Sequence, residues 1–196
     1  MEQKSTFWKS AMTYGVYLAG ISIVWSLIIW AGGLLEKMGL FGSMALGLVN
    51  LAIMVTFLLI CTKLYRDRVL DGNITFGNAF VLGLMIVVFS TIITGVFSYI
   101  LNKYIDPEYM GRVVAAMQEK MYQWLSSKGM SQDQIDAAMT KFEQKGVKTP
   151  FETVIANIEG GLIGGSIMSL ISSAIVKKNK KSDAFEEAMD EIKPEE

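Results

Sequence analysis

Residue types that carry catalysis or bind metals are scarce in this sequence. It has no histidine and a single cysteine, Cys61, so it lacks the commonest general base and metal ligand and has no cysteine pair. Gly164, Gly165 and Ser166 are similar to the beginning of a serine-hydrolase nucleophile motif, but Met168 stands where that motif has its second glycine. We therefore predict a protein that is not an enzyme, with no catalytic residue, no metal site and no cofactor.

Two polar residues in apolar surroundings remain as functional candidates. Asn50 lies in the middle of an apolar stretch, where an uncharged polar side chain commonly hydrogen-bonds to another helix; lining a substrate path is the alternative. Glu159 is a charge inside an apolar stretch, which is a functional hypothesis in itself. Counting about 20 residues back from Val176 places it within about one helical turn of water. We favour a side chain that reaches the interface over pairing with a cation or an ion-linked role.

The apolar residues gather in four long stretches. The chain is 52% hydrophobic and only 19% charged, which is more apolar than a soluble domain needs. Charged residues are absent between Lys9 and Glu36, Lys37 and Lys63, Asp71 and Lys103, and Glu159 and Lys177. A helix of about 20 residues crosses a bilayer core, and such spans must be helical unless a barrel closes. We predict transmembrane helices at about residues 11–35, 40–62, 75–101 and 154–176, the first being retained as an anchor.

Residues 106–149 depart from the membrane pattern and predict a helical insert. Asp106 followed by Pro107 is typical of a helix start, and Gly129 of a helix end. The apolar residues between them recur at three- and four-residue steps, which places them on one face: Met110, Val113, Val114, Met117, Met121, Trp124 and Leu125.

A second insert helix begins with a capping box formed by Ser131 and Gln134. Its apolar positions are Ile135, Ala138, Met139 and Phe142, and Gly146 and Pro150 should end it. We favour packing of both apolar faces on each other and on the membrane domain. Binding of a partner or of the lipid surface is the alternative.

Positive charges predict the orientation of the chain. Lysine and arginine in short loops stay on the cytoplasmic side. They occur at the amino terminus, in the second connection and in the tail: Lys4, Lys9, Lys63, Arg66, Arg68, Lys177, Lys178, Lys180 and Lys181. We expect cytoplasmic termini and an extracytoplasmic hairpin, with residues 1–178 forming the membrane domain and residues 179–196 a charged, disordered tail.

Small residues recur along the fourth apolar stretch. Gly161, Gly165, Ser169 and Ser173 follow one another at four-residue steps, with Gly160 and Gly164 beside them. Such a stripe lets a neighbouring backbone approach closely, either within the bundle or across a homo-oligomer. Two alternatives stay open: membrane helices simply tolerate glycine, or the glycines form a hinge.

Three motifs resemble an uncharacterised family of small bacterial membrane proteins, domain of unknown function 4199. They are Lys63-Leu64-Tyr65-Arg66-Asp67-Arg68, Gly72-Asn73-Ile74-Thr75-Phe76-Gly77-Asn78-Ala79-Phe80, and Tyr104-Ile105-Asp106-Pro107-Glu108. The resemblance covers roughly residues 5–178. It implies a bacterial inner-membrane location and a four-helix plan, and it supplies no activity or functional residues.

The sequence as a whole predicts an all-α integral membrane four-helix bundle, with an extracytoplasmic helical hairpin between the third and fourth transmembrane helices. A net charge of −1 gives no reason to expect nucleic acid as a partner. The expected partners are the lipid bilayer, a second copy through the fourth transmembrane helix and an unknown protein. We favour an accessory or assembly protein that acts through helix and protein contacts; a small oligomeric transporter or channel component is the alternative.

Overall fold

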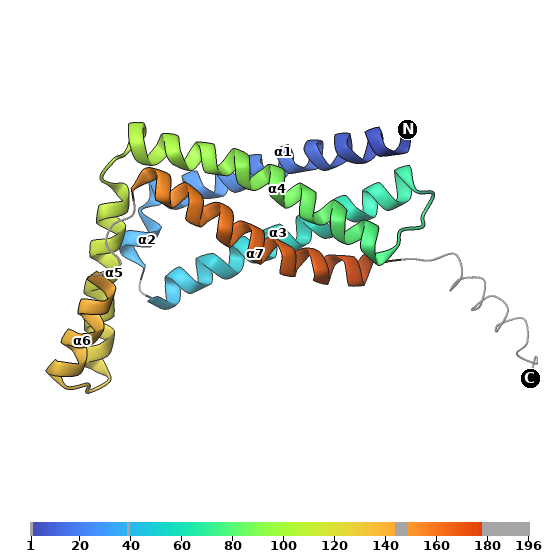
Figure 1. The fold of residues 1–196 in the computed structure, drawn as a ribbon. Helices are drawn as coiled ribbons and strands as arrows, with labels where there is room; N and C mark the ends of the chain where they lie inside the picture. Colours follow the sequence, from blue (N-terminus) through green and yellow to red (C-terminus); the bar gives the residue numbers. More distant parts are fainter. Residues whose placement is uncertain (1, 39, 144–148, 178–196) are drawn as a thin grey trace, which may run out of the picture. The chain divides into compact units, whose positions relative to one another are not determined.

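The computed structural model describes residues 2–38, 40–143 and 149–177, and these are almost entirely helical (Figure 1). The elements, in chain order, are α1 (Glu2–Gly32), α2 (Leu34–Lys37), α3 (Leu40–Val69), α4 (Phe76–Ile100), the π-helical turn η1 (Leu101–Ile105), α5 (Tyr109–Ser127), α6 (Gln132–Glu143) and α7 (Pro150–Val176). Four helical segments within the described residues are long and apolar enough to cross a membrane: Thr6–Gly32, Gly42–Val69, Phe76–Ile105 and Pro150–Val176. The predicted all-α fold with four membrane-spanning helices is confirmed, and the chain is a multi-pass membrane protein.

Local backbone signals explain where two of the spanning helices begin and end. The first was predicted to run to residue 35, but α1 ends at Gly32 because Gly33 takes a left-handed conformation with φ 58°. The fourth was predicted from residue 154, but α7 begins at Pro150. Thr149 and Glu152 form a reciprocal capping box there: the Glu152 carboxylate accepts from the Thr149 backbone N–H, and the Glu152 N–H donates to the Thr149 hydroxyl.

The described chain divides into two compact units, and each spanning helix contributes one half to each unit. Unit 1 contains the described residues of Met1–Leu18, Ile53–Ser90 and Gly161–Glu196. Its core joins the four half-helices through buried apolar side chains: Ala11, Leu18, Leu58, Cys61, Tyr65, Ala79, Leu82, Ile86, Val87 and Val176. Arg66 in α3 donates to the Val176 carbonyl at 3.2 Å, which satisfies a backbone acceptor at the end of α7.

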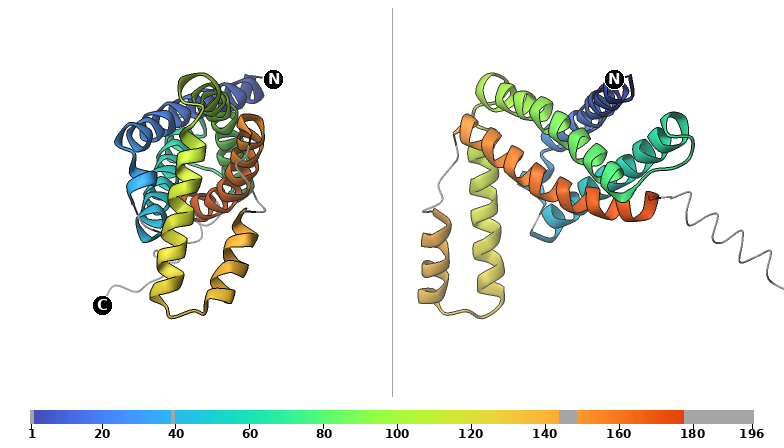
Figure 2. Two further views of the ribbon diagram at one scale, coloured as in Figure 1. Left: turned by 90° about the vertical axis from the view of Figure 1, so that its left-hand side faces the viewer. Right: turned by 45° about the vertical axis from the view of Figure 1, so that its right-hand side comes forward.

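Unit 2 contains the described residues of Ala19–Ala52 and Thr91–Gly160. Within it, α5 and α6 lie side by side as an antiparallel pair, and α2 packs against α5 (Figure 2). Gly129 makes the turn between α5 and α6 with φ 71°, a conformation that suits glycine. The Gln134 side chain accepts from the Ser131 N–H at 3.2 Å, so the second insert helix begins at the predicted residues.

One prediction about the insert is wrong. The Asp106 side chain does not cap α5, because it is engaged elsewhere by Trp30 and Arg112; the residue that precedes α5 is Glu108. The described part of the second insert helix extends to Glu143, and Pro150, which was expected to follow its end, is the first residue of α7. Gly146 and the tail 179–196 lie outside the described residues.

Candidate functional site

The small residues of α7 fall into two groups according to what surrounds them. Gly165 faces α4, and a Cβ atom there would overlap the Val87 side chain. One turn further, Ser169 lies against Gly83 of α4 and donates a hydrogen bond to the Phe80 carbonyl at 2.8 Å. The absence of side chains at Gly83 and Gly165 therefore lets the two helices approach closely, which favours van der Waals contact.

The remaining small residues of α7 are placed differently. Ser173 is fully buried and donates to the Ser169 carbonyl one turn before it. Gly161 is half-buried. A Cβ atom at Gly160 or Gly164 would meet open space, so no contact within the chain requires glycine at these two positions. Within this stripe of small residues, Gly165 and Ser169 therefore pack against α4, whereas Gly160 and Gly164 do not need to be small for any contact within the described chain.

Asn50 and Glu159, the two polar candidates of the spans, are both exposed in unit 2. Neither takes part in a hydrogen bond or ion pair with another residue that the structure describes. A different pair of polar residues joins two spanning helices in this unit: the Asn157 amide of α7 donates to the Ser98 hydroxyl of α4 at 3.1 Å. Asn102 also donates to the Ser98 carbonyl at 2.7 Å.

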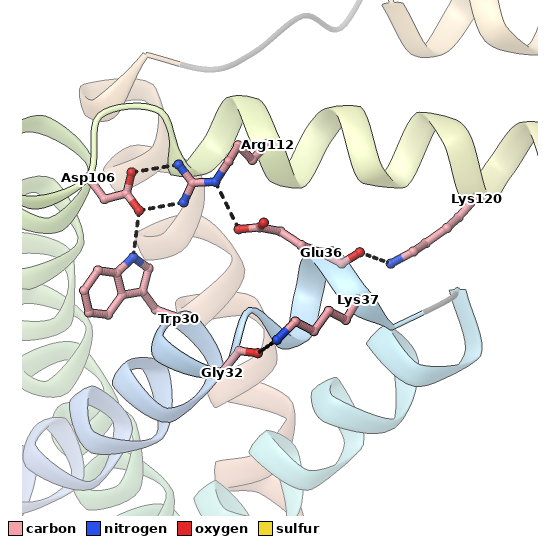
Figure 3. Close-up of polar contacts among 7 residues, drawn as sticks. All are labelled: Trp30, Gly32, Glu36, Lys37, Asp106, Arg112 and Lys120. Carbon is pink, nitrogen blue, oxygen red and sulfur yellow. Dashed lines mark hydrogen bonds and ion pairs between the residues drawn. The ribbon is translucent and has the colours of Figure 1, made fainter.

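The most extensive polar cluster of unit 2 lies where the insert leaves the membrane-spanning segment (Figure 3). Asp106, just after η1, accepts two hydrogen bonds from Arg112 of α5, at 3.0 and 2.7 Å. The same carboxylate accepts from the Trp30 indole N–H of α1 at 3.0 Å. Paired bonds between a guanidinium and a carboxylate fix both charge and orientation. We call Trp30, Glu36, Asp106, Arg112 and Lys120 the polar clamp.

The other two clamp residues attach the short helix α2 to α5. The Arg112 Nε atom donates to the Glu36 carboxylate at 3.3 Å. The Lys120 ammonium donates to carbonyl groups at the end of α2, those of Leu35, Glu36 and Met38. A lysine at such a helix end satisfies acceptors that have no partner within the helix and complements the helix dipole.

Electrostatics keeps the Asp106–Arg112 pair of the clamp ionised. The hydrogen bonds from Arg112 and then Trp30 lower the pKa of Asp106 to about 2. The same carboxylate raises the pKa of Arg112 above its usual range. Burial, followed by the charge of Glu36, raises the pKa of Tyr109, whose ring lies 6.0 Å from the Arg112 guanidinium carbon.

This arrangement suits positioning rather than acid-base chemistry. A general acid or base acts best with a pKa near the working pH, whereas Asp106 is held ionised by two donors. The described residues contain no group of three histidine, cysteine or acidic side chains that could hold a metal. What the clamp can do is hold α5 at a fixed place on α1 and α2.

Reasoning from the sequence missed the clamp because its members are far apart along the chain. Trp30 and Asp106 are 76 residues apart, and so are Glu36 and Arg112. Asp106 and Arg112 are close in sequence, but their six-residue separation matches no helical pairing rule. The one signal in the sequence for a polar contact here is that Glu36 and Asp106 lie close to the ends of apolar stretches.

The packing of α7 on α4 predicts that neighbouring glycines differ in their tolerance of a side chain. Gly165→Leu should destabilise the protein by about 1–3 kcal/mol, because overpacking would push Val87 out of place. Gly164→Leu, the matched control, should unfold at close to the wild-type temperature because its Cβ meets open space. Thermal unfolding in detergent measures both, and equal melting temperatures for the two variants would contradict the close approach.

The clamp predicts that Arg112 limits the motion of α5. Arg112→Gln removes the ion pairs to Asp106 and Glu36, so the backbone amides of α5 should exchange hydrogen faster, as measured by mass spectrometry. Lys128→Gln removes a positive charge at the other end of α5 and serves as the control. If the two variants exchange alike, Arg112 does not hold the helix.

The same exchange measurement has a defined pH dependence. Because the pKa of Asp106 in the folded protein is about 2, below the roughly 3.9 of a free aspartate, its ionised form stabilises the clamp fully above about pH 4. This stabilisation is lost as the pH falls from about 4 through 2. After each rate is divided by the intrinsic exchange rate at that pH, Asp106→Asn should show a smaller difference between pH 4 and lower pH than the wild type does.

Comparison with known proteins supplies a family but no activity. A search of curated proteins and a search of solved structures each found no match. A family model described as "Protein of unknown function (DUF4199)" matches residues 13–178, which include all four membrane-spanning helices except residues 2–12 of α1. This chain of four spanning helices and a clamped helical insert therefore belongs to the DUF4199 family.

Proposed function

We propose that this protein is a non-enzymatic membrane protein that presents the α5–α6 hairpin as a binding element for another protein. The observation that carries the proposal is an apolar stripe of α5 that the chain covers only in part. Val113 and Leu125 of this helix are buried. Val114, Met117 and Met121 are half-buried, and Trp124 is 40% exposed although it lies on the same apolar face.

The chemistry of this stripe suits protein recognition. Tryptophan is enriched among the residues that contribute most to protein interfaces. Methionine is flexible and polarizable, so it adapts to irregular apolar surfaces. The sequence left two uses open for this face, and its exposure at Trp124 supports binding of a partner over complete packing within the chain.

The polar clamp contributes to the proposed binding by restraining α5. Arg112 and Lys120 attach this helix to Glu36 and to the carbonyl groups of α2. A binding element that is already ordered loses less conformational freedom when its partner arrives. The clamp thus has a role in affinity without contacting the partner itself.

We also propose that the protein resides in a bacterial inner membrane with both termini in the cytoplasm and the hairpin outside it. The support is the concentration of Lys63, Arg66 and Arg68 in one short connection between apolar stretches. A partner of the hairpin would then be an extracytoplasmic protein or the extracytoplasmic part of another membrane protein.

A transporter or channel component is the less supported alternative. It would need polar side chains that are free to meet a solute along the spans. Asn50 and Glu159 are free in this sense, but they lie on different helices. Asn157 and Ser98 instead bond to each other across α7 and α4, which is the use of polar residues expected for helix packing.

The proposed orientation predicts opposite labelling of two introduced cysteines. In intact inner-membrane preparations of a cysteine-free variant carrying Cys61→Ala, an impermeant thiol reagent should label Ser127→Cys and leave Asp67→Cys unlabelled. Permeabilising the membrane should expose Asp67→Cys and supplies the control for reactivity. The reverse pattern of labelling would overturn the orientation.

The binding proposal predicts partner contact at one face of the hairpin. A photocrosslinking amino acid placed at Trp124 should give a discrete adduct with another protein in native membranes. The same amino acid at Ser126, which is exposed but about 200° around the helix, should give little or none. Arg112→Gln should reduce the adduct at Trp124. Equal adducts at both positions, or none at either, would refute the binding role.

A further inference from the structure

A stretch of α3 in unit 2, residues 47–52, is uncovered on all sides. Every residue from 47 to 52 is exposed. Met44 and Leu48 are each 65% exposed, and a Cβ atom at Gly47 would meet open space. Lipid tails are as apolar as such a helix surface, so the exposed leucines and methionine need no protein partner.

Asn50 is the exception on this surface. It lies midway in sequence between Lys37 and Lys63, the charges that flank the span, and so is deep in the hydrocarbon layer. Its amide makes no hydrogen bond to another residue that the structure describes. A primary amide without partners in hydrocarbon costs several kcal/mol on scales where nothing else can bond to it. Something other than lipid is therefore expected to meet Asn50.

We propose that a second copy of this chain meets it, through a symmetric contact of the two α3 helices that pairs Asn50 with Asn50 of the other copy. An asparagine amide carries both a donor and an acceptor, so two identical side chains related by a two-fold axis satisfy each other reciprocally. A single buried asparagine is an established device for fixing the register of paired helices.

Depth in the membrane favours a second copy over an unrelated protein. Two copies insert in the same orientation because the same loop charges direct both, so their Asn50 side chains lie at the same depth. An unrelated helix would need a polar side chain that happens to match this depth. Gly47, one turn away on the same side of α3, allows the two backbones to approach.

This contact adds a second place of association to the one expected along α7, where Gly160 and Gly164 remain open. Gly165 and Ser169 of α7 are covered by α4 of the same chain, so these residues are not available to a second copy. Asn50 and Gly47, by contrast, are exposed. The proposed association is independent of the binding role of the hairpin, because the two rest on different helices.

The first experiment measures where copies touch. In a Cys61→Ala background, Asn50→Cys and Leu48→Cys each provide a single cysteine, and copper phenanthroline oxidises them in native membranes and in liposomes of purified protein. Leu48 is the matched control, since it is more than one-third exposed but about 200° around the helix. We expect disulfide-linked dimers for Asn50→Cys and few for Leu48→Cys.

The second experiment measures the strength of association by energy transfer between labelled copies in liposomes. Asn50→Leu should weaken dimerisation roughly tenfold, the change that corresponds to about 1.4 kcal/mol of interhelical hydrogen bonding. Asn50→Gln keeps the amide and should retain most of the association, and Leu48→Ala should leave it unchanged. Thermal unfolding and helical content of each variant verify that it is folded.

Four outcomes would overturn the proposal. Equal crosslinking of Asn50→Cys and Leu48→Cys would show that no specific contact forms at this face. Association of Asn50→Leu as strong as that of wild type would show that the amide is not used. Crosslinking of Asn50→Cys only to a different protein would show that the other protein, and not a second copy, meets the amide. A wild-type protein that is monomeric and whose own helices cover position 50 would show that the amide is satisfied within the chain.

Discussion

Peptide groups inside hydrocarbon must find their hydrogen-bond partners within the protein, and this constraint accounts for most of the architecture. Helices meet it everywhere except at their ends, where several acceptors or donors have no partner. The described structure supplies such partners from side chains, some distant in sequence and some local. Arg66 donates to the last carbonyl of α7, Lys120 to carbonyls at the end of α2, and Thr149 with Glu152 closes the start of α7.

The same constraint governs how the spanning helices adhere to one another. Lipid is as apolar as leucine, so burial of apolar surface gives little preference for one helix neighbour over another. Close backbone approach and interhelical hydrogen bonds supply that preference. In unit 1, Gly83 and Gly165 provide the approach and Ser169 the bond to Phe80; in unit 2, Asn157 bonds to Ser98.

Outside the spans, ion pairs and charged hydrogen bonds, and not close packing of small residues, hold α5 in place. Asp106 has a side chain suited to capping α5, but Arg112 and Trp30 together donate three hydrogen bonds to it. Hydrogen bonds from a charged donor are stronger than those from a backbone N–H, so the carboxylate is more stable in the clamp than it would be as a helix cap. The helix start is left to Glu108, which makes no side-chain cap. One local rule fails here because a non-local interaction is stronger.

Much of the fold followed from the sequence, because hydrophobic length and helical period are local properties. The four charge-free stretches indicated the spanning helices, and Gly129, Ser131 and Gln134 marked the turn between α5 and α6. The capping pair of Thr149 and Glu152 is also a local signal, and it starts α7 at Pro150, four residues before the expected span. The family resemblance likewise depended on short contiguous motifs.

Which side chains meet was decided only by the tertiary structure. The helical period places Gly165 and Ser169 on one stripe of α7. Only the tertiary structure shows that these two residues pack against α4 whereas Gly164 faces open space. Trp124 shares the apolar face of Leu125, yet only the position of neighbouring helices leaves the tryptophan exposed. The clamp joins α1, α2 and α5 across 76 residues. A sequence specifies the faces of its helices through local geometry, whereas the partner of each face depends on how the helices are brought together.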